Sequence, residues 1–597
     1  MSENIYASFH EHVLDVLKKI IPDLPENILK RVELVPTREL AHGDMATNAA
    51  MVAAKAAGRK PQEIAGELAA GLCSVPAIKS AEVAGPGFVN ITLEASVFLQ
   101  LIPTILARKE QFGHAETPKN LVVNVEYVSA NPTGPMHVGH CRGAVVGDVL
   151  ANILHKAGYK VTKEYYINDA GTQVNALAWA AYWRYLQAIG LSISDEVFEK
   201  DVPGGLQYKG DYLIEVGEAL KQKYDQSLAP EGKIAPVDLW FAPVKEMALD
   251  YMMARIRQDL SSLGVYHEVF TSEAAVLAGG AVEIAINKLQ AKGLLYTGIL
   301  PPPKGKQLEE WEERPQLLFK ATQFGDDVDR ALRKADGSNT YFANDIGYHN
   351  TKIQQGADIV IDVLGADHGG YVARMRAAVK ALSHDRPADK PVDFEAVICQ
   401  IVRVVRNGQP VKMSKRAGTF VTLHDLIDEV GKDAVRFTML TRKADAQMDF
   451  DLDQVVAHTR DNPVFYVQYA HARCCSILRS AQDVWPDILL VEDASPANLL
   501  LLNDEAEMNL IKHIAQWPRL VEAAAATREP HRVAFYLMDL AAFFHGLWNR
   551  GKDNTQLRFI QSDDYTASLP RIMLVMATAI VLRSGFAVLG VDPVEEM

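Results

Sequence analysis

The sequence predicts a multidomain α/β protein with a central parallel β-sheet, a smaller α/β module before it and an all-α helical bundle after it. Three observations support this prediction. The chain has 597 residues, too many for one hydrophobic core, so we expect roughly three to five domains. Strand and helix patterns alternate through the middle of the chain. From about Asp449 onward the pattern is almost entirely helical.

The first domain is expected to be the α/β module, which ends near residue 110. Helical periodicity appears in two stretches, and a strand pattern with a tight Gly-Pro-Gly turn at its entry follows them. These elements are Ile5–Ile20, Pro61–Leu72 and the strand Ala81–Leu93.

The catalytic domain is expected over residues 111–400, where a strand at Leu121–Val128 begins a strand–helix–strand unit. The helix runs from about His140 to Ala157, and the next strand from Tyr159 to Ile167. This order predicts a Rossmann-like parallel sheet with right-handed crossovers, whose ligands lie at the carboxyl ends of the strands. An insertion rich in Gly, Asp, Lys and Pro interrupts it at about 190–240. The sheet pattern then resumes at Leu263–Phe270, Leu294–Ile299 and Asp358–Gly365.

Residues 401–455 are expected to form a connecting domain, and residues 456–597 the helical bundle. Phe465–Leu478 and Val533–Trp548 carry apolar residues at three- and four-residue spacing, while Arg571–Leu589 is uniformly apolar. The last segment is therefore predicted to be a buried helix of the bundle.

The composition is that of a soluble, cytoplasmic protein. Apolar residues make up 48% and charged residues 23% of the chain, and no apolar run approaches the roughly 20 residues that span a bilayer. The N-terminus lacks the regions of a signal peptide. A net charge of −14 argues against nucleic-acid binding over the whole surface. Residues 371–443 contain 14 Lys or Arg and 8 Asp or Glu, and this local positive charge is either a basic binding face or an ordinary solvated surface.

The five cysteines include no C-x-x-C pair. Cys474 and Cys475 are adjacent, which is compatible with a metal or redox site or with two helix residues, one of them partly buried. A reducing compartment fits this usage, and we expect no structural zinc and no protein-bound metal.

The loop between the first strand and helix of the catalytic domain carries two imidazoles, His137 and His140. They lie where unpaired backbone N–H groups and the positive end of the helix dipole favour phosphate. An H-x-x-H pair alone is also typical of an ordinary helix start. A second motif is Val411-Lys-Met-Ser-Lys-Arg-Ala-Gly418, whose first lysine, Lys412, follows His140 by 272 residues. Its two lysines, Lys412 and Lys415, could neutralise charge that develops on a polyphosphate.

Together the two motifs resemble the HIGH and KMSKS signatures of class I aminoacyl-tRNA synthetases. Val138 replaces the usual Ile, and Arg416 replaces the final Ser. The resemblance implies that ATP activates an amino acid as its adenylate, with His137, His140, Lys412 and Lys415 as the catalytic residues and Mg²⁺ carried on the phosphates. It also implies that Gly139 admits the adenine ring. Asp367 and His368 would contact ATP or stabilise their turn. The full set implied for ATP binding is His137, Gly139, His140, Asp367, His368, Lys412, Met413, Ser414 and Lys415.

Longer segments are similar to bacterial arginyl-tRNA synthetases over essentially the whole chain. They are Glu126–His140, Tyr166–Gln173, Tyr341–Asp345, Asn462–Arg473 and Val591–Met597. A guanidinium needs planar carboxylate acceptors, and Asp345, at a predicted strand end, and Glu126 are candidates, although either could be a structural or surface carboxylate. The arginine-binding residues that the resemblance implies are Glu126, Ser129, Asn131, Tyr341 and Asp345.

The resemblance also implies two tRNA-contacting regions. In the first module, Phe88 would stack on an exposed base of the tRNA and Asn90 would hydrogen-bond the edge of that base. The alternative is that Phe88 is a core residue of its strand. In the bundle, Tyr466, Tyr469 and Arg473 lie near one helical face and would meet anticodon bases, or the tyrosines are core residues.

The expected protein is therefore a monomeric, cytoplasmic arginine–tRNA ligase whose partners are ATP, L-arginine and tRNA(Arg). Family members typically bind tRNA before the adenylate forms. A cysteine-specific relative would need zinc ligands, and the isoleucine, leucine and valine enzymes a longer insertion. A non-enzymatic tRNA-binding paralogue would not need both signatures.

Overall fold

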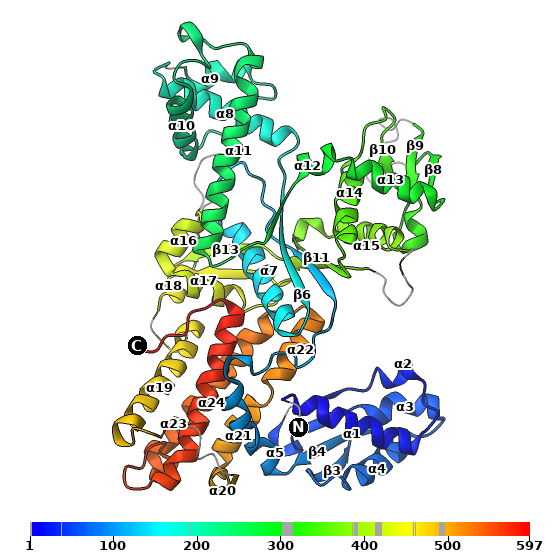
Figure 1. The fold of residues 1–597 in the computed structure, drawn as a ribbon, viewed down its shortest axis with the longest axis vertical. Helices are drawn as coiled ribbons and strands as arrows, with labels where there is room; N and C mark the ends of the chain where they lie inside the picture. The colour runs from blue at the N-terminus through cyan, green and yellow to red at the C-terminus, as the bar shows by residue number, and fades with distance from the viewer. Residues whose placement is uncertain are drawn as a thin grey trace. The chain divides into compact units, whose positions relative to one another are not determined.

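The protein is described in a computed structural model that covers residues 3–37, 39–191, 193–300, 314–384, 386, 392–411, 421–457, 459, 461–488 and 496–597. It divides into two compact units (Figure 1). One comprises residues 119–155 and 159–457, and the other comprises residues 1–118, 156–158 and 458–597.

A five-stranded parallel sheet forms the centre of the first unit, as the sequence predicts. The strand order is β12-β11-β5-β6-β7, and every neighbouring pair is parallel. Helix α7 connects β5 to β6 and begins at the predicted imidazole loop. Its Gly147 leaves room for Tyr127, because a Cβ there would lie 2.3 Å from the ring. The bounds are β5 (Val122–Glu126), α7 (Val138–Lys156), β6 (Lys160–Ile167), β7 (Val269–Ser272), β11 (Ile359–Gly365) and β12 (Asp393–Cys399).

Two of the predicted strands differ from the structure. The strand predicted at 263–270 is the shorter β7, because helix α11 (Val237–Ser262) precedes it and Gly264 turns the chain at φ 73°. The strand predicted at 294–299 is β8 (Leu295–Gly298), which lies outside the parallel sheet. It pairs antiparallel with β9 (Gln316–Phe319) in a separate three-stranded sheet with β10 (Arg330–Arg333).

The predicted insertion contains helices and continues into α11. Helices α8 (Thr172–Ala188), α10 (Ile214–Tyr224) and α11 surround a core of their own, seen at the upper left of Figure 1. Tyr182 and Trp240 stack at its centre with ring centroids 3.8 Å apart. The insertion is therefore a folded element with a hydrophobic core.

In the second unit, helices α1 (Ile5–Ile20) and α4 (Pro61–Leu72) begin and end at the predicted residues. The strand predicted at 81–93 is a hairpin of β3 (Ile78–Ala84) and β4 (Phe88–Leu93), which the Gly-Pro-Gly turn joins. These strands form a four-stranded sheet with β1 (Leu34–Pro36) and β2 (Met45–Thr47).

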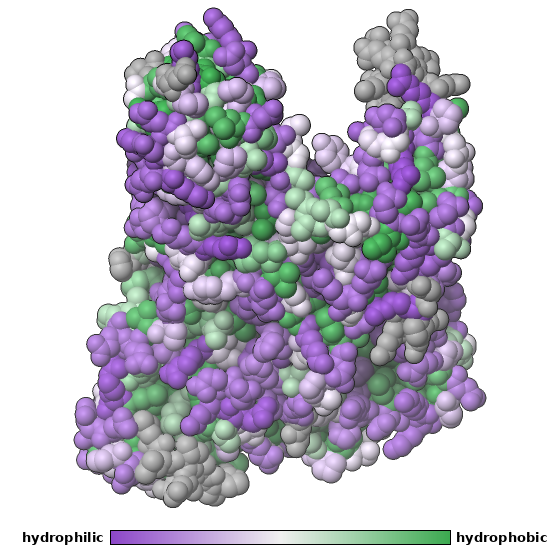
Figure 2. Space-filling model, turned by 45° about the horizontal axis from the view of Figure 1, so that its top comes forward, coloured by the Kyte–Doolittle hydropathy of each residue, from purple (hydrophilic) through white to green (hydrophobic). Residues whose placement is uncertain are grey.

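The C-terminal part of this unit is helical, as predicted, with α19 (Pro463–Val484), α23 (His531–Asp553) and α24 (Tyr565–Leu589) packed together. Among the described residues, α24 is the one helix long and apolar enough to cross a membrane, and 78% of its apolar window is buried. The face seen in Figure 2 is largely hydrophilic, with scattered apolar residues.

Candidate active site

The loop that follows β5 has an unusual backbone. Val128 and Ser129 have φ values of 72° and 38°, in the left-handed region that β-branched residues rarely adopt. Ser129 is held on three sides: its hydroxyl donates to Glu126 Oε1 (2.9 Å) and accepts the Tyr166 N–H (3.0 Å), and its carbonyl accepts from Asn168 (3.1 Å). Strain of this kind persists where surrounding contacts determine the conformation, as they do here.

The two predicted imidazoles are brought together, with ring centroids 3.9 Å apart in a stacked arrangement. The His137 N–H donates to His140 Nδ1 (3.3 Å), and the Gly139 N–H donates to His137 Nδ1 (3.1 Å). A ring nitrogen that accepts a hydrogen bond carries no proton, so Nε2 carries the hydrogen in each ring. The Nε2 atom of His137 is buried in this structure.

Gly139 has a role inside the protein that the sequence did not reveal. A Cβ at this position would lie 2.8 Å from His137 Cε1, closer than real Cβ contacts allow. The glycine is therefore required for the His137 ring to lie back over the helix start, independently of any bound adenine.

A hollow of about 290 Å³ opens beside the imidazoles. Asn131 and Gln173 contribute polar groups to it, and Tyr208 and Tyr212 form part of its wall. The two tyrosines come from the insertion, and sequence reasoning missed them because no motif links them to the loop. The hollow is lined by Asn131, Thr133, Gly134, Pro135, His137, His140, Gln173, Tyr208 and Tyr212.

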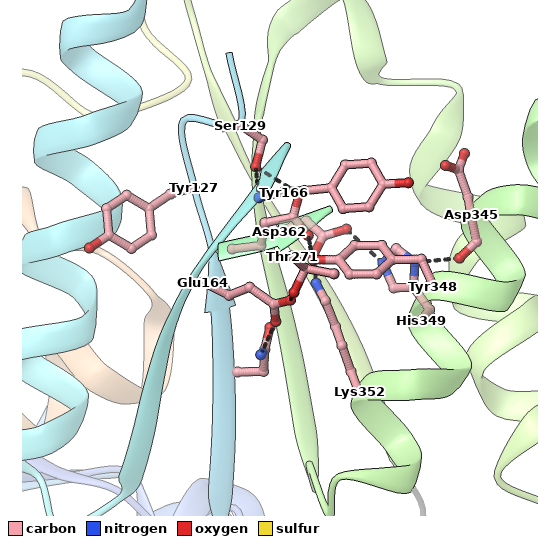
Figure 3. A network of polar contacts seen from close by, with 12 residues as sticks. Tyr127, Ser129, Glu164, Tyr166, Thr271, Asp345, Tyr348, His349, Lys352 and Asp362 are labelled. Atoms are coloured by element: carbon pink, nitrogen blue, oxygen red, sulfur yellow. Dashed lines mark hydrogen bonds and ion pairs between the residues drawn. The ribbon is translucent and has the colours of Figure 1, made fainter. Parts of the chain in front are cut away.

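Three carboxylates lie side by side across the sheet, level with the last residue of β5. The strand register pairs Glu126 of β5 with Asp362 of β11 and with Glu164 of β6. The fully buried Lys352 of α14 (Tyr341–Gln354) reaches into this row (Figure 3), with Nζ 2.6 Å from Glu126 Oε2 and 3.4 Å from Asp362 Oδ1. Glu126 Oε2 also accepts from the Tyr348 hydroxyl at 2.8 Å. The charge of Glu126 is therefore already balanced by the protein.

Asp345 is the fifth residue of helix α14, so its predicted position at a strand end is wrong. The Thr340 side chain accepts the Ala343 N–H and begins the helix there. His349, one turn later, pairs with Asp362 (3.0 Å) and hydrogen-bonds the Asp345 carbonyl. Figure 3 shows the Asp345 carboxylate pointing away from Lys352. Among the described residues, no ion pair forms on it.

The surroundings of Asp345 disfavour its charge. The pKa of its carboxyl is raised to about 7, chiefly by burial and also by the nearby charges of Glu126, Asp362 and Glu273, while His349 acts in the opposite direction. The negative charge of Asp345 in turn contributes to raising the pKa of the Tyr166 and Tyr371 hydroxyls, although burial is the larger cause for both. A cation placed beside Asp345 would relieve this repulsion.

The remaining predicted active-site residues lie differently. Tyr341 is 84% exposed at the start of α14. Asp367 and His368 are exposed beyond the carboxyl end of β11, with Asp367 Oδ1 3.7 Å from His368 Nε2. Lys412, Met413, Ser414 and Lys415 lie outside the described residues.

The predicted contacts in the N-terminal module lie on one face of β4. Phe88 is 38% exposed, so the alternative that it is a core residue is wrong, and Asn90 lies on the same side of the strand. Phe88 lines a hollow of about 380 Å³, whose other lining residues are Arg31, Glu33, Val35, Ala46, Asn48, Met51 and Val52.

The predicted residues of the bundle all lie on α19 and cluster with His545 of α23. The Arg473 guanidinium lies 4.4 Å from the centroid of the Tyr469 ring and donates to His545 Nδ1 (3.0 Å). Tyr466 packs against His545 with ring centroids 4.8 Å apart. Tyr469 is exposed and Tyr466 is half-buried, so neither is a core residue.

Cys474 and Cys475 both lie in α19 and are buried, so the expectation that one is only partly buried is wrong. Cys475 Sγ lies 3.8 Å from Nδ1 of His471, one turn earlier in the same helix.

Comparisons with known proteins cover most of the chain. Family models match residues 7–93 ("Arginyl tRNA synthetase N terminal domain"), 101–190 and 304–473 ("tRNA synthetases class I (R), catalytic domain") and 467–597 ("DALR anticodon binding domain"). The model of the catalytic domain thus leaves out the segment 191–303.

Individual relatives match from end to end. The chain is 59% identical to "Arginine--tRNA ligase" of Gluconobacter oxydans (strain 621H), over 99% of this chain and 98% of that protein. It is 51% identical to the protein of the same name from Ruegeria pomeroyi, over the full length of both. The solved arginyl-tRNA synthetase of Thermus thermophilus has the same fold, with a TM-score of 0.74 at 21% identity over 99% of this chain and 100% of that one.

Proposed function

This chain belongs to the arginyl-tRNA synthetase family and is an arginine–tRNA ligase, and on that basis we propose which residues carry the reaction. Asp345 receives the guanidinium of the substrate, and His137 and His140 bind the phosphates of ATP. Glu126, Ser129 and Asn131 hold the rest of the arginine molecule. The uncompensated carboxylate of Asp345 is the observation that supports this assignment most strongly.

The enzyme joins arginine to tRNA(Arg) in two steps. An oxygen of the arginine carboxylate attacks the α-phosphorus of ATP, and the bond to the β-phosphate oxygen breaks, which gives arginyl-adenylate and diphosphate. A hydroxyl of the 3′-terminal ribose then attacks the arginyl carbonyl carbon and displaces AMP. Neither step requires a covalent bond to the protein, so alignment and stabilisation of charge supply the catalysis.

The imidazole pair is suited to the first step. Both Nε2 atoms carry hydrogens, because both Nδ1 atoms accept backbone N–H groups. We propose that the two imidazoles bind phosphate oxygens at the start of α7, where the helix dipole adds to the attraction. Lys412 and Lys415 would stabilise the leaving diphosphate, with Met413, Ser414, Gly139, Asp367 and His368 completing the ATP site.

The carboxylates Glu126 and Asp345 are suited to binding arginine. Lys352 balances Glu126, whereas Asp345 is held beside other negative groups with its pKa raised to about 7. A guanidinium is always protonated and presents a planar fork of donors that matches a carboxylate. Tyr341 would contact the same group after a change of side-chain position, since it is exposed in the free protein.

The pH dependence of arginine binding tests this assignment. The guanidinium binds the ionised carboxylate, so binding is fully developed above the pKa of about 7 and is lost as the pH falls below it. We expect the KM for arginine to rise about tenfold for each pH unit below neutrality, with a much smaller change in the KM for ATP. A KM for arginine that is flat between about pH 5.5 and about pH 8 would contradict the role of Asp345.

The other parts of the proposal concern tRNA, metal and assembly. The module of residues 1–110 would contact tRNA through Phe88 and Asn90, and the bundle of residues 456–597 through Tyr466, Tyr469 and Arg473. Residues 111–400 would carry the chemistry and 401–455 connect it to the bundle. We propose that Mg²⁺ is carried on the phosphates of ATP. We further propose a monomer located in the cytoplasm.

A further inference from the structure

Two side chains of the segment 191–303 bind the backbone of the loop that precedes the imidazoles. The Tyr212 hydroxyl donates to the Thr133 carbonyl at 2.8 Å, and Asp259 Oδ2 accepts the Met136 N–H at 3.1 Å. The class I catalytic-domain model does not match this segment. Its contacts with the loop therefore lie outside the part of the chain that this model describes.

Tyr212 fits closely against the loop. A Cβ at Gly134 would lie 3.3 Å from the Tyr212 hydroxyl oxygen, and a Cβ at Gly210 would lie 2.3 Å from its ring. The ring thus packs against two backbone positions that have no side chain. The ring also packs against the hydrophobic core of the insertion, which helps to fix where the hydroxyl points.

Asp259 binds the backbone of the residue that precedes His137. It is 5% exposed near the end of α11, and its hydrogen bond uses the N–H of Met136, the residue before His137. The Met136 carbonyl accepts the Leu423 N–H at 2.9 Å. Both backbone groups of Met136 are therefore committed, one to α11 and one to the segment that follows the lysine motif.

We propose that Tyr212 and Asp259 are positioning residues for adenylate formation, which hold the loop so that His137 and His140 meet the phosphates in the reactive geometry. This inference rests on the proposed role of the two imidazoles. Neither residue needs to contact ATP, because each acts through the backbone of Thr133 or Met136. The segment 191–303 then serves as a support for the catalytic loop in addition to forming its own core.

The expected consequence is a loss of turnover with little loss of substrate binding. A shift of about 1 Å in a catalytic group can lower the rate about 100-fold, while the guanidinium is assigned to Asp345 of α14, which lies outside this loop. Asp259→Ala removes the acceptor for the Met136 N–H, whereas Asp259→Asn keeps an oxygen acceptor of the same length. Tyr212→Phe removes only the hydroxyl and keeps the packed ring.

The experiment measures arginine-dependent exchange of diphosphate into ATP, in the presence of tRNA, with the purified full-length variants. We expect Asp259→Ala to lower kcat about 10- to 100-fold with the KM for arginine unchanged within about twofold. Asp259→Asn should restore kcat to within about threefold of the parent, and Tyr212→Phe should lower it about three- to tenfold.

A matched control comes from the opposite end of the sheet. Asp358 Oδ2 accepts the Val122 N–H at 2.9 Å, which is the same kind of bond far along the strand from the imidazoles. Asp358→Ala should lower the unfolding temperature while leaving kcat near that of the parent. An equal loss of kcat in Asp358→Ala and Asp259→Ala would show a general structural effect and overturn the inference.

His140→Ala distinguishes failure of the proposed role of the imidazoles from failure of the positioning role of Tyr212 and Asp259. A normal rate in His140→Ala would overturn both the proposed role of the imidazoles and this inference. A reduced rate in His140→Ala, together with normal rates in Asp259→Ala and Tyr212→Phe, would overturn this inference alone. If Asp259→Ala does not fold, Tyr212→Phe decides the question, because it removes a single oxygen atom.

Discussion

Replacing Asp345 with alanine is expected to weaken arginine binding about 100- to 1,000-fold while ATP binding is spared. The substitution removes the carboxylate that we assign to the guanidinium and leaves that cation without its partner, beside the buried Tyr166 and the half-buried Tyr371. Losing one partner of a buried, hydrogen-bonded charge pair costs about 3–5 kcal/mol.

The measurement is the KM for arginine and for ATP in tRNA charging. Asp345→Asn keeps the size of the side chain and removes its charge, so it should lose a large part of the same affinity. Asp367→Ala is a useful comparison, because this exposed carboxylate is assigned to the ATP side and should leave arginine binding unchanged. Unchanged arginine affinity in Asp345→Ala would exclude the assigned role.

Replacing Lys352 with methionine is expected to destabilise the unit that contains the parallel sheet by about 3–5 kcal/mol. The strand register brings Glu126, Asp362 and Glu164 together, and Lys352 is a fully buried cation that lies among them. Without it, buried carboxylates lose their partner and must take up protons or water.

Thermal unfolding followed with arginine absent measures this effect. Lys209→Met is a matched control, because Lys209 also contacts two carboxylates, Asp195 and Glu199, at 2.9 and 3.1 Å, but is 36% exposed. This surface lysine should contribute at most about 1 kcal/mol. The double variant Glu126→Gln with Lys352→Met should recover part of the lost stability. Equal effects of the two lysine substitutions would contradict the proposed role of Lys352.

The sequence was most informative where chemistry is local. The strand, loop and helix around His137 and His140 follow from a short run of residues, and the structure places both imidazoles together. The parallel sheet follows from the alternation of strands and helices. Helices α1 and α4 also have local start and stop signals, such as the Asn4 cap and Pro61 in the first turn.

The parts that escaped prediction depend on contacts between distant residues. Tyr212 and Thr133 are 79 residues apart, and Asp259 and Met136 are 123 apart, so no spacing rule connects them. Asp345 lies on a helix and not at a strand end because Thr340 caps the start of α14, a local signal that the strand prediction does not use. One signal was present for Lys352: it follows Asp345 by seven residues, which puts both near one face of a helix that packs on the sheet.

The central claim is that the uncompensated carboxylate of Asp345 receives the guanidinium, and calorimetric titration with arginine tests it most directly. The titration is run at about pH 6.5, because an acid with a pKa of about 7 is mostly protonated at that pH before arginine binds. Buffers of different ionisation enthalpy report how many protons are released on binding. We predict that the parent enzyme releases most of one proton when arginine binds and that Asp345→Asn releases none. Equal proton release by the two proteins, or no release by the parent, would contradict the claim.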